Sequence, residues 1–349
     1  MKKVRTYLTM VACLLVCSLP VIASAQDKAP PTPREIVPQA DQRVDLKKLA
    51  PAKPKEGWFP SFNIGLNTSV VHTSAVPGIE NGLTFSFGLA VNGGLTYLEG
   101  QHEWKSELKI IHTQTKTPAL NVFVKTADQF DLKSFYTYKS KRYKTVGFFG
   151  GIQLNTQLFS GEFVSPTSRD ITILKVDNTK EDKVIVGNNP FVLTEALSPM
   201  IIKALMGLDS LPFEGKFNKL KFRLSGAGQQ VFANGFTLAD DAATPRLEIK
   251  ELQSYFQAGI QMNIALNGKV NKRLSYEFLT ELMYPIVTSI DTELKGFDLL
   301  NADISFKLSL KLASWASLDY SFRAQKLPLL SEAWQVTNNL VLSLTANVI

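Results

Sequence analysis

Three histidines are the most chemically versatile residues of the chain, and their spacing limits what they can do together. His102 and His112 lie ten residues apart in an alternating stretch, which is about 33 Å at about 3.3 Å per residue of strand. They cannot share a metal ion. His72 and His112 are expected about 10 Å apart, because they lie near the same end of two strands that have one other strand between them. Both belong to the apolar faces of their strands. We therefore interpret the histidines as structural residues near the ends of strands, at a rim or in an aromatic girdle, and predict no metal site and no cofactor.

Paired carboxylates are the second candidate for chemistry. Glu277 and Glu281 face the same way on an extended chain, about 13 Å apart, and Glu103 and Glu107 repeat that spacing. The acid and base of glycoside hydrolysis lie about 5 to 9.5 Å apart, so neither pair fits alone. No G-x-S-x-G, H-E-x-x-H or phosphate-loop pattern occurs. We expect no catalytic residues and no enzyme activity.

The elements that carry these residues alternate between apolar and polar positions over unusual lengths. In residues 82–97 the odd positions from Leu83 to Tyr97 are apolar except Gly93, and the even positions are small or polar. Side chains of a strand alternate between two faces. A strand of a soluble protein has about 5 to 6 residues, whereas about 9 to 11 cross a bilayer. The length predicts a membrane-spanning strand.

Twelve segments of this kind follow residue 57. The connections between them alternate between long and short, as expected when loops at one rim of a barrel are long and turns at the other are short. This pattern predicts an all-β protein, a transmembrane up-and-down antiparallel β-barrel of about twelve strands with both termini at the short-turn side. The segments are 60–72, 82–97, 101–115, 127–140, 144–160, 196–210, 217–232, 253–270, 273–288, 296–312, 315–327 and 336–348.

The longest connection, 161–195, contains two further β-prone stretches, 171–176 and 183–186, around a turn-like sequence. Each is too short to cross the hydrocarbon core. We expect a hairpin outside the membrane or a loop folded into the mouth of the barrel. The alternative is that both stretches join the barrel and raise the strand count to fourteen.

The charged residues lie on one face of each predicted strand. Because a cation facing lipid at the bilayer midplane costs about 2 to 4 kcal/mol, this face should point into the lumen. Aromatic residues gather instead beside the short turns, as a girdle of Tyr97, Trp104, Tyr138, Tyr276 and Trp315. The lumen-lining candidates are Glu103, Lys105, Glu107, Lys109, Asp131, Lys133, Glu277, Glu281, Asp303, Lys307, Lys311, Asp319 and Arg323.

The N-terminal residues predict an export route. Basic residues, an apolar stretch and the small residues Ala23-Ser24-Ala25 are typical of a signal peptide over 1–25, cleaved near Ala25. Residues 26–56 are rich in proline and charge and predict a periplasmic linker, either a spacer or a docking peptide. The barrel then occupies 57–349. Both cysteines, Cys13 and Cys17, precede the cleavage site, so no disulfide is expected afterwards.

Several short sequences resemble a family of Gram-negative outer-membrane barrels known only as a domain of unknown function. The resemblance covers most of the barrel and implies its fold, without supplying catalytic residues. It is carried by Gly57-Trp58 before Phe62-Asn63-Ile64-Gly65-Leu66-Asn67, by Glu80-Asn81-Gly82-Leu83-Thr84-Phe85-Ser86-Phe87, by the Trp104 strand, by Lys125-Thr126-Ala127-Asp128-Gln129-Phe130-Asp131-Leu132, and by Leu197-Ser198-Pro199 leading to Gly207-Leu208-Asp209.

Three functions agree with these observations. The first is a passive outer-membrane channel for small polar solutes, with the charged rows as its wall. The second is a plugged structural or partner-binding barrel of a Gram-negative envelope, in which the charges pair with one another. The third is a lipid enzyme, although His112 and Ser86 have opposite parity. We expect contacts with membrane lipid and the barrel insertion machinery. The formal charge of +7, which signal-peptide removal lowers by three, is too small to indicate nucleic acid.

Overall fold

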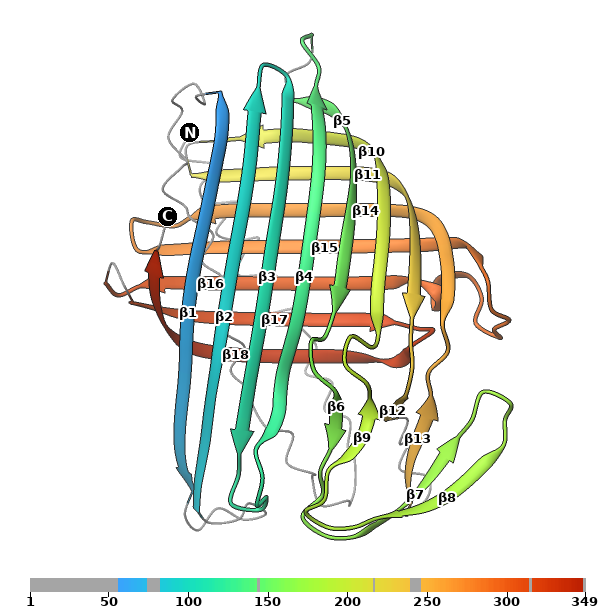
Figure 1. Ribbon diagram of the computed structural model, residues 1–349. Helices are drawn as coiled ribbons and strands as arrows, with labels where there is room; N and C mark the ends of the chain where they lie inside the picture. The colour runs from blue at the N-terminus through green and yellow to red at the C-terminus, as the bar shows by residue number, and fades with distance from the viewer. Residues whose placement is uncertain are drawn as a thin grey trace, which may run out of the picture. The chain divides into compact units, whose positions relative to one another are not determined.

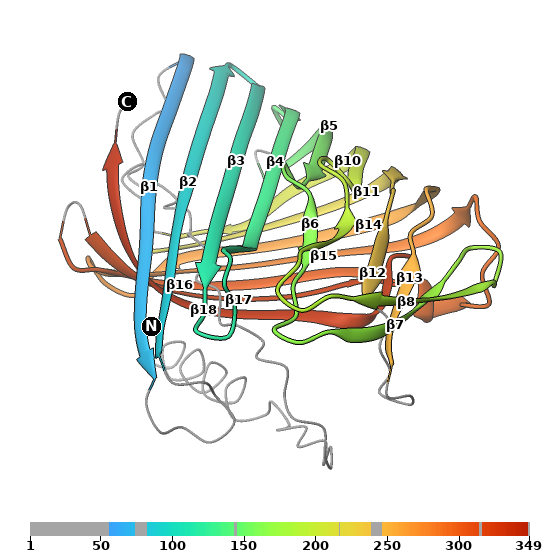
Figure 2. The same ribbon diagram turned by 60° about the horizontal axis from the view of Figure 1, so that its bottom comes forward.

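Twelve antiparallel strands close into a barrel in the computed structural model, which describes residues 56–73, 82–142, 145–215, 217–238, 246–313 and 316–347. Strands on the near wall cross those on the far wall steeply (Figures 1 and 2), as tilted barrel strands do. Each strand pairs with its neighbour along the chain, and β18 pairs with β1. The barrel strands are β1 (Gly57–Thr73), β2 (Gly82–Glu99), β3 (His102–Lys116), β4 (Val124–Lys139), β5 (Val146–Thr156), β10 (Met200–Glu214), β11 (Asn218–Phe232), β14 (Tyr255–Lys269), β15 (Leu274–Thr288), β16 (Asn301–Lys311), β17 (Ala316–Leu327) and β18 (Ser331–Asn347).

This topology confirms the predicted all-β barrel of twelve strands, although several boundaries differ by three to five residues from the prediction, among them the end of β5 at Thr156 and the end of β10 at Glu214. β16 begins at Asn301 rather than 296, because Gly296–Leu299 forms a short 3-10 helix. The predicted loop 328–335 is wrong: β18 begins at Ser331, which pairs with Leu327, and Leu330 donates to the Leu327 carbonyl at 2.9 Å. A tight turn of Pro328-Leu329-Leu330 replaces the loop. One connection on the long-loop side is therefore short.

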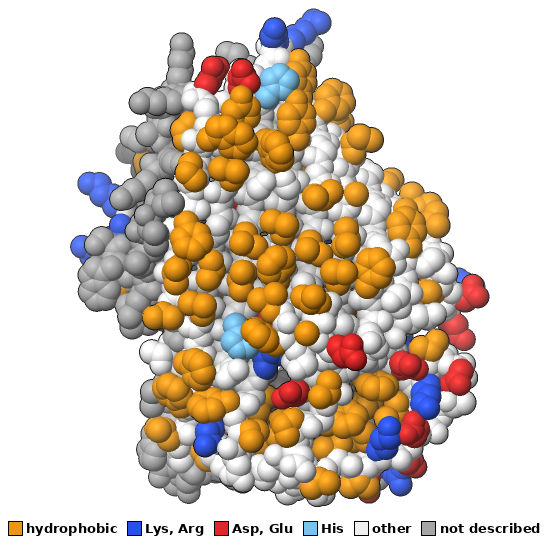
Figure 3. All heavy atoms as spheres, viewed as in Figure 1, with side chains coloured by type: hydrophobic (Ala, Val, Ile, Leu, Met, Phe, Trp, Pro, Cys, Tyr) orange, Lys and Arg blue, Asp and Glu red, His pale blue; other side chains and the backbone are white. Residues whose placement is uncertain are grey.

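The outer face of the barrel is apolar. Phe87, Leu89, Phe148, Ile152 and Met206 all point outward and are exposed, with Met206 at 77%. Hydrophobic side chains cover the visible face of the barrel in Figure 3. Soluble monomers rarely expose apolar patches beyond a few hundred Å², so this face is suited to lipid.

Aromatic rings gather beside the first short turn. The rings of Trp58 and Tyr97 are 4.7 Å apart, and those of Trp58 and Trp104 are 6.5 Å apart. Tyr276 donates to Asn218 Oδ1 at 3.0 Å beside another short turn. Trp315, the last residue of the predicted girdle, lies outside the described residues. The described rings have the arrangement of an interfacial girdle.

The predicted signal peptide and all of the linker except Glu56 also lie outside the described residues. Among the described residues, no helix is long and apolar enough to cross a membrane.

Two long loops build a separate sheet beyond the ends of β5, β10, β11 and β14 (Figure 1). The predicted hairpin is confirmed as β7 (Arg169–Leu174) and β8 (Lys180–Ile185). It joins β13 (Leu247–Glu251) and β12 (Phe236–Leu238) from the next long loop, and we name the sheet β12-β13-β7-β8 the loop sheet. The fourteen-strand alternative is therefore wrong. A small pair, β6 (Gly161–Phe163) and β9 (Phe191–Thr194), lies in the same loop as the hairpin.

The loop sheet has its own apolar core. Its buried members are Ile171, Ile173, Ile185, Leu247 and Ile249, and Phe163, Phe191, Leu193 and Phe236 pack against them. The aliphatic side chains come from both long loops, so the core joins segments far apart in the sequence.

Close packing of the barrel wall leaves little room for a side chain at Gly207. A Cβ on Gly207 would overlap the carbonyl oxygen of Leu224 and lie 2.5 Å from the Cα of Ser225. We expect Gly207→Ala to destabilise the barrel by about 1 to 3 kcal/mol, measured as a lower urea midpoint of heat-modifiable gel mobility. Gly226 is the matched control, because its Cβ would come no nearer than 4.0 Å to Met206 O. Equal midpoints for the two variants would contradict this prediction.

The hairpin carries carboxylates whose pKa values are lowered by specific hydrogen bonds. Thr179 donates to Asp177 and holds the pKa of that carboxyl below its usual range. Thr172 does the same for the pKa of Asp182. Hydrogen bonds from two lysines lower the pKa of Glu181. All three groups therefore favour the folded hairpin in their charged form.

Acid should consequently loosen the hairpin. A depressed carboxyl pKa stabilises the folded form above the unfolded pKa, about 3.9 for Asp and 4.3 for Glu, and this stabilisation is lost as pH falls through the folded value. We expect faster hydrogen exchange of the β7 and β8 amides, relative to unfolded reference peptides, as pH falls below about 4. The same comparison between pH 6 and pH 8 should show no change. Protection that is constant down to pH 2 would contradict the prediction.

Candidate functional site

The thirteen predicted lumen residues lie on the strand face opposite the exposed apolar side chains. On β3, Glu103, Lys105, Glu107 and Lys109 alternate with exposed Trp104 and its neighbours. In the strand register they stand beside inward positions of β2 and β4. The remaining candidates follow the same alternation on β4, β15, β16 and β17.

In the part of the chain that the structure describes, an ion pair crosses the lumen. Lys133 on β4 and Glu281 on β15 approach to 3.7 Å between Nζ and Oε1. Four strands, β5, β10, β11 and β14, separate β4 from β15 in the barrel order. The two side chains meet because they reach across the interior rather than along the wall. The lumen is therefore spanned at this level, and we name this pair the crosspiece.

Other predicted residues pair along the far wall. Arg323 donates twice to Asp303, from Nε at 3.1 Å and from Nη2 at 2.6 Å. Asp319 is buried and accepts hydrogen bonds from Ser309 and Ser317. Glu277 and Lys307 stand opposite each other in the register. These contacts satisfy charges that would otherwise be costly inside the barrel.

A second charged group, on β10 and β11, was not predicted from the sequence. Arg223 Nε donates to buried Asp209 at 2.6 Å, and Lys221 Nζ lies 3.0 Å from the same carboxylate. The Arg223 guanidinium also lies over the rings of Phe135 and Phe149, 4.7 and 4.6 Å from their centroids. The odd-position alternation of charges in 200–214 and 218–232 was the signal that could have identified this group.

The two halves of the lumen differ in polarity. In the half near the short turns, the Lys105–Glu107 ion pair has side chains that are 52% and 50% exposed. Towards the long loops the inward side chains of β11 and β14 are neutral and buried. There Gln229 donates to Gln257 at 3.2 Å, and Asn301 donates to Gln257 at 2.9 Å. These side-chain amides fill the part of the interior that contains no charged side chains among the described residues.

A polar cavity of about 100 Å³ lies between these walls. Residues of β4, β5 and β10 line one side, and residues of β15, β16 and β17 line the other, with Gln229 and Gln261 between them. Both members of the crosspiece belong to its lining. The cavity thus combines charged groups from opposite walls in one small volume.

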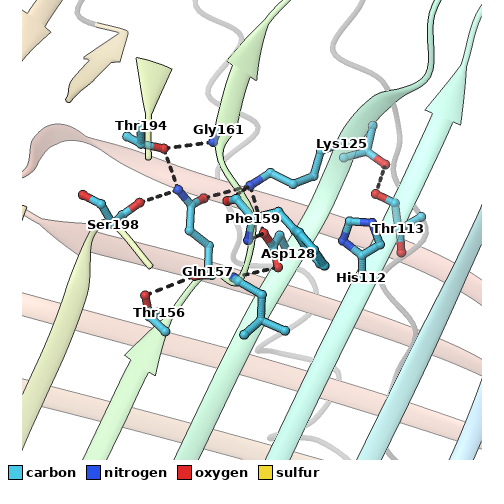
Figure 4. A network of polar contacts seen from close by, with 12 residues as sticks. His112, Thr113, Lys125, Asp128, Thr156, Gln157, Phe159, Gly161, Thr194 and Ser198 are labelled. Atoms are coloured by element: carbon cyan, nitrogen blue, oxygen red, sulfur yellow. Dashed lines mark hydrogen bonds and ion pairs between the residues drawn. The ribbon is translucent and has the colours of Figure 1, made fainter. Parts of the chain in front are cut away.

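His112 lies outside the lumen, beside a buried polar network (Figure 4). Asp128 accepts from Lys125 Nζ at 2.9 Å and from the amides of Leu158 and Phe159 at 3.0 and 2.8 Å. The His112 ring is 4.6 Å from the Phe159 ring. This network ties the end of β5 and the start of the long loop to the barrel wall.

The histidines do not assemble a catalytic site in the described part of the chain. The outward neighbours of His112 are Leu89, Gln114, Asp128 and Phe159, none of which carries a hydroxyl. His102 Nδ1 instead lies 2.5 Å from the Tyr136 hydroxyl. The side chain of His72 is not among those described. No group of three metal-ligating side chains occurs among the described residues.

Comparisons with known proteins give one partial match to a family model and weak similarities to solved structures. Residues 80–161 match a family model described as "Protein of unknown function (DUF3078)". The match includes the 80–87, Trp104 and 125–132 motifs, whereas the motifs at 57–67 and 197–209 lie outside it. No curated relative matches the chain.

Solved structures are similar only at low identity. The translocator domain of the autotransporter NalP from Neisseria meningitidis is 5% identical, with 84% of this chain and 89% of that chain covered and a TM-score of 0.38. An outer membrane channel from Pseudomonas putida F1 is 9% identical, with 87% and 98% covered and a TM-score of 0.38. The Pseudomonas putida toluene transporter TodX is 8% identical, with 82% and 80% covered and a TM-score of 0.33. Similarities this weak carry no argument about function.

Proposed function

We propose that this chain is an outer-membrane β-barrel whose lumen is closed to passive diffusion at rest, and that it serves the envelope as a structural or partner-binding barrel. The observation that carries the proposal is the crosspiece, in which Lys133 and Glu281 meet at 3.7 Å across the interior. Buried Gln229, Gln257 and Gln261 add a neutral layer towards the long loops. A path for solutes would require both groups of side chains to move.

The location rests on two features. The apolar exterior with its aromatic girdle suits a bilayer, and the predicted signal peptide over 1–25 would direct export from a Gram-negative cytoplasm. Membrane lipid and the barrel insertion machinery are the partners that such a location implies. The loop sheet and the segment 26–56 are the surfaces through which envelope partners would act.

A passive channel for small polar solutes is the second candidate. The half-exposed Lys105–Glu107 pair and the charged cavity favour it, because polar solutes need hydrogen-bonding walls. In this case the crosspiece would be the constriction and would have to separate during conduction.

Conductance in planar bilayers tests the proposal. Protein purified from membranes after expression of the full chain, with folding verified by heat-modifiable gel mobility, is expected to be silent. The variant Lys133→Ala/Glu281→Ala/Gln257→Ala removes both ends of the crosspiece and the amide to which Gln229 and Asn301 donate, and it is expected to show openings. Lys105→Ala/Glu107→Ala is the matched control, because it removes an ion pair from the wider half and should stay silent. Steady conductance of the unmodified protein would overturn the closed-barrel proposal in favour of the channel.

A further inference from the structure

The cavity at the crosspiece has a balanced set of charges. Its walls present equal numbers of cations and carboxylates, so the lining itself has no formal net charge. A ligand with a net charge would leave that charge unbalanced in a low-dielectric interior, which is costly. A ligand without net charge avoids this. The charged lining residues are Lys133, Lys203, Arg323, Asp131, Glu281 and Asp303.

These charges are not equally satisfied. Asp303 and Arg323 form a two-point pair, Lys133 meets Glu281, and Asp131 accepts hydrogen bonds from two amide side chains. Lys203 differs, because no carboxylate of the described residues lies within ion-pair distance of its Nζ. A cation in this position requires an acceptor of hydrogen bonds or a negative group.

Unmatched acceptors lie on the same cavity. Gln261 Oε1 and Asn301 Oδ1 are buried and have no hydrogen-bond partner among the described residues. Gln261 is completely buried and Asn301 is 4% exposed, so bulk water does not reach them freely. A buried acceptor without a donor costs about 1 to 3 kcal/mol. A ligand that satisfies all of these groups needs a negative or hydrogen-bond-accepting group for Lys203 and a hydrogen-bond donor for the two amide oxygens.

We propose that this cavity is a binding site for a small zwitterion of the amino-acid class. The carboxylate of the ligand would accept from Lys203, and its ammonium group would donate to Gln261 Oε1 and Asn301 Oδ1 after these two buried amide groups turn toward the cavity. A zwitterion keeps the cavity neutral while it supplies both missing partners. The site goes beyond the proposed envelope role and does not depend on whether the barrel conducts.

The size of the cavity guides the choice of ligand. A volume of about 100 Å³ corresponds to about three waters at about 30 Å³ each, or to a compact molecule of about five non-hydrogen atoms. Glycine is of this size and is therefore the member of the class that we test.

Equilibrium dialysis with three radiolabelled probes tests the site. Glycine is the zwitterion, acetate has only its negative group, and methylammonium has only its positive group. The full chain in detergent, verified as folded by heat-modifiable mobility, is expected to retain glycine at least 10-fold more strongly than either single-charge probe. Equal retention of acetate and glycine would overturn the zwitterion in favour of an anion site. Retention of none of the probes would show a cavity filled by solvent only.

Two lysine variants identify the side chain responsible. Lys203→Met is expected to lower glycine retention at least 10-fold. The carboxylate of glycine would lose Lys203, the one cation of the described lining that is not already in an ion pair. Lys116→Met removes an exposed cation at the end of β3 and should leave retention unchanged. If Lys203→Met fails to fold, Lys203→Gln keeps a donor and should retain partial binding. Undiminished retention in a folded Lys203 variant would overturn the assignment.

Discussion

Replacing Ile249 with aspartate is expected to unfold the loop sheet and leave the barrel closed. Ile249 is fully buried in the core formed by Ile171, Ile173, Ile185 and Leu247. Truncation of such a side chain alone costs about 2 to 5 kcal/mol, and an unpaired carboxylate adds a further penalty. The barrel strands pair among themselves without the loop sheet, so their register does not depend on it.

Limited proteolysis would detect this effect. Cleavage within 157–199 should become rapid in Ile249→Asp, whereas heat-modifiable mobility of the barrel should be retained. Val184→Asp introduces the same charge on the same sheet at a side chain that is 64% exposed, and should resist cleavage like the unmodified protein. Loss of the folded barrel in Ile249→Asp would show that the sheet supports the barrel and would contradict the prediction.

Replacing Asp128 with alanine is expected to produce the second large effect, a loss of about 3 to 5 kcal/mol. The Asp128 side chain is 2% exposed, and among the described residues it is the only carboxylate in ion-pair contact with Lys125, which is itself 14% exposed. Its removal leaves a buried cation without its counter-charge and leaves the amides of Leu158 and Phe159 without their acceptor. The urea midpoint of the barrel should fall, and exchange at those two amides should accelerate.

Matched variants separate the charge from the hydrogen bonds. Asp128→Asn keeps an acceptor oxygen and loses the charge, so an intermediate loss is expected. Asp170→Ala removes an exposed carboxylate of the loop hairpin and should leave the midpoint unchanged. Identical midpoints for Asp128→Ala and Asp170→Ala would show that the network does not hold the loop.

Local patterns predicted the barrel well because its strands need little information beyond alternation and length. Residues 82–97 alternate faces, and that pattern alone places Leu89 outside and Ala90 inside, as the structure confirms. The hairpin was equally local, since its turn and both arms are adjacent in the sequence. The turn at 328–330 was missed because Leu329 and Leu330 are apolar, whereas Gly, Asn, Asp and Ser are the usual residues of tight turns.

Long-range pairings could not be predicted from the same patterns. The parallel pairing of β7 with β13 joins segments from two different loops, and periodicity carries no information about such partners. The crosspiece depends on which inward residues of distant strands stand at one height, which the tilt and stagger of the closed barrel determine. Arg223 was missed although its alternation was visible, because only the fold brings it over Phe135 and Phe149.

The pairing of β1 with β18 has a consequence for the order of assembly. Among the residues that the structure describes, the two strands are joined through four registered pairs, from Asn63 with Asn347 to Leu66 with Leu344, whereas β1 and β2 share a register over the whole of Gly57–Thr73. Contacts between the ends of a chain require the largest loop closure and form slowly. We therefore expect the short seam between β1 and β18 to be the last part of the barrel wall to form, and the first to open when the barrel is unfolded.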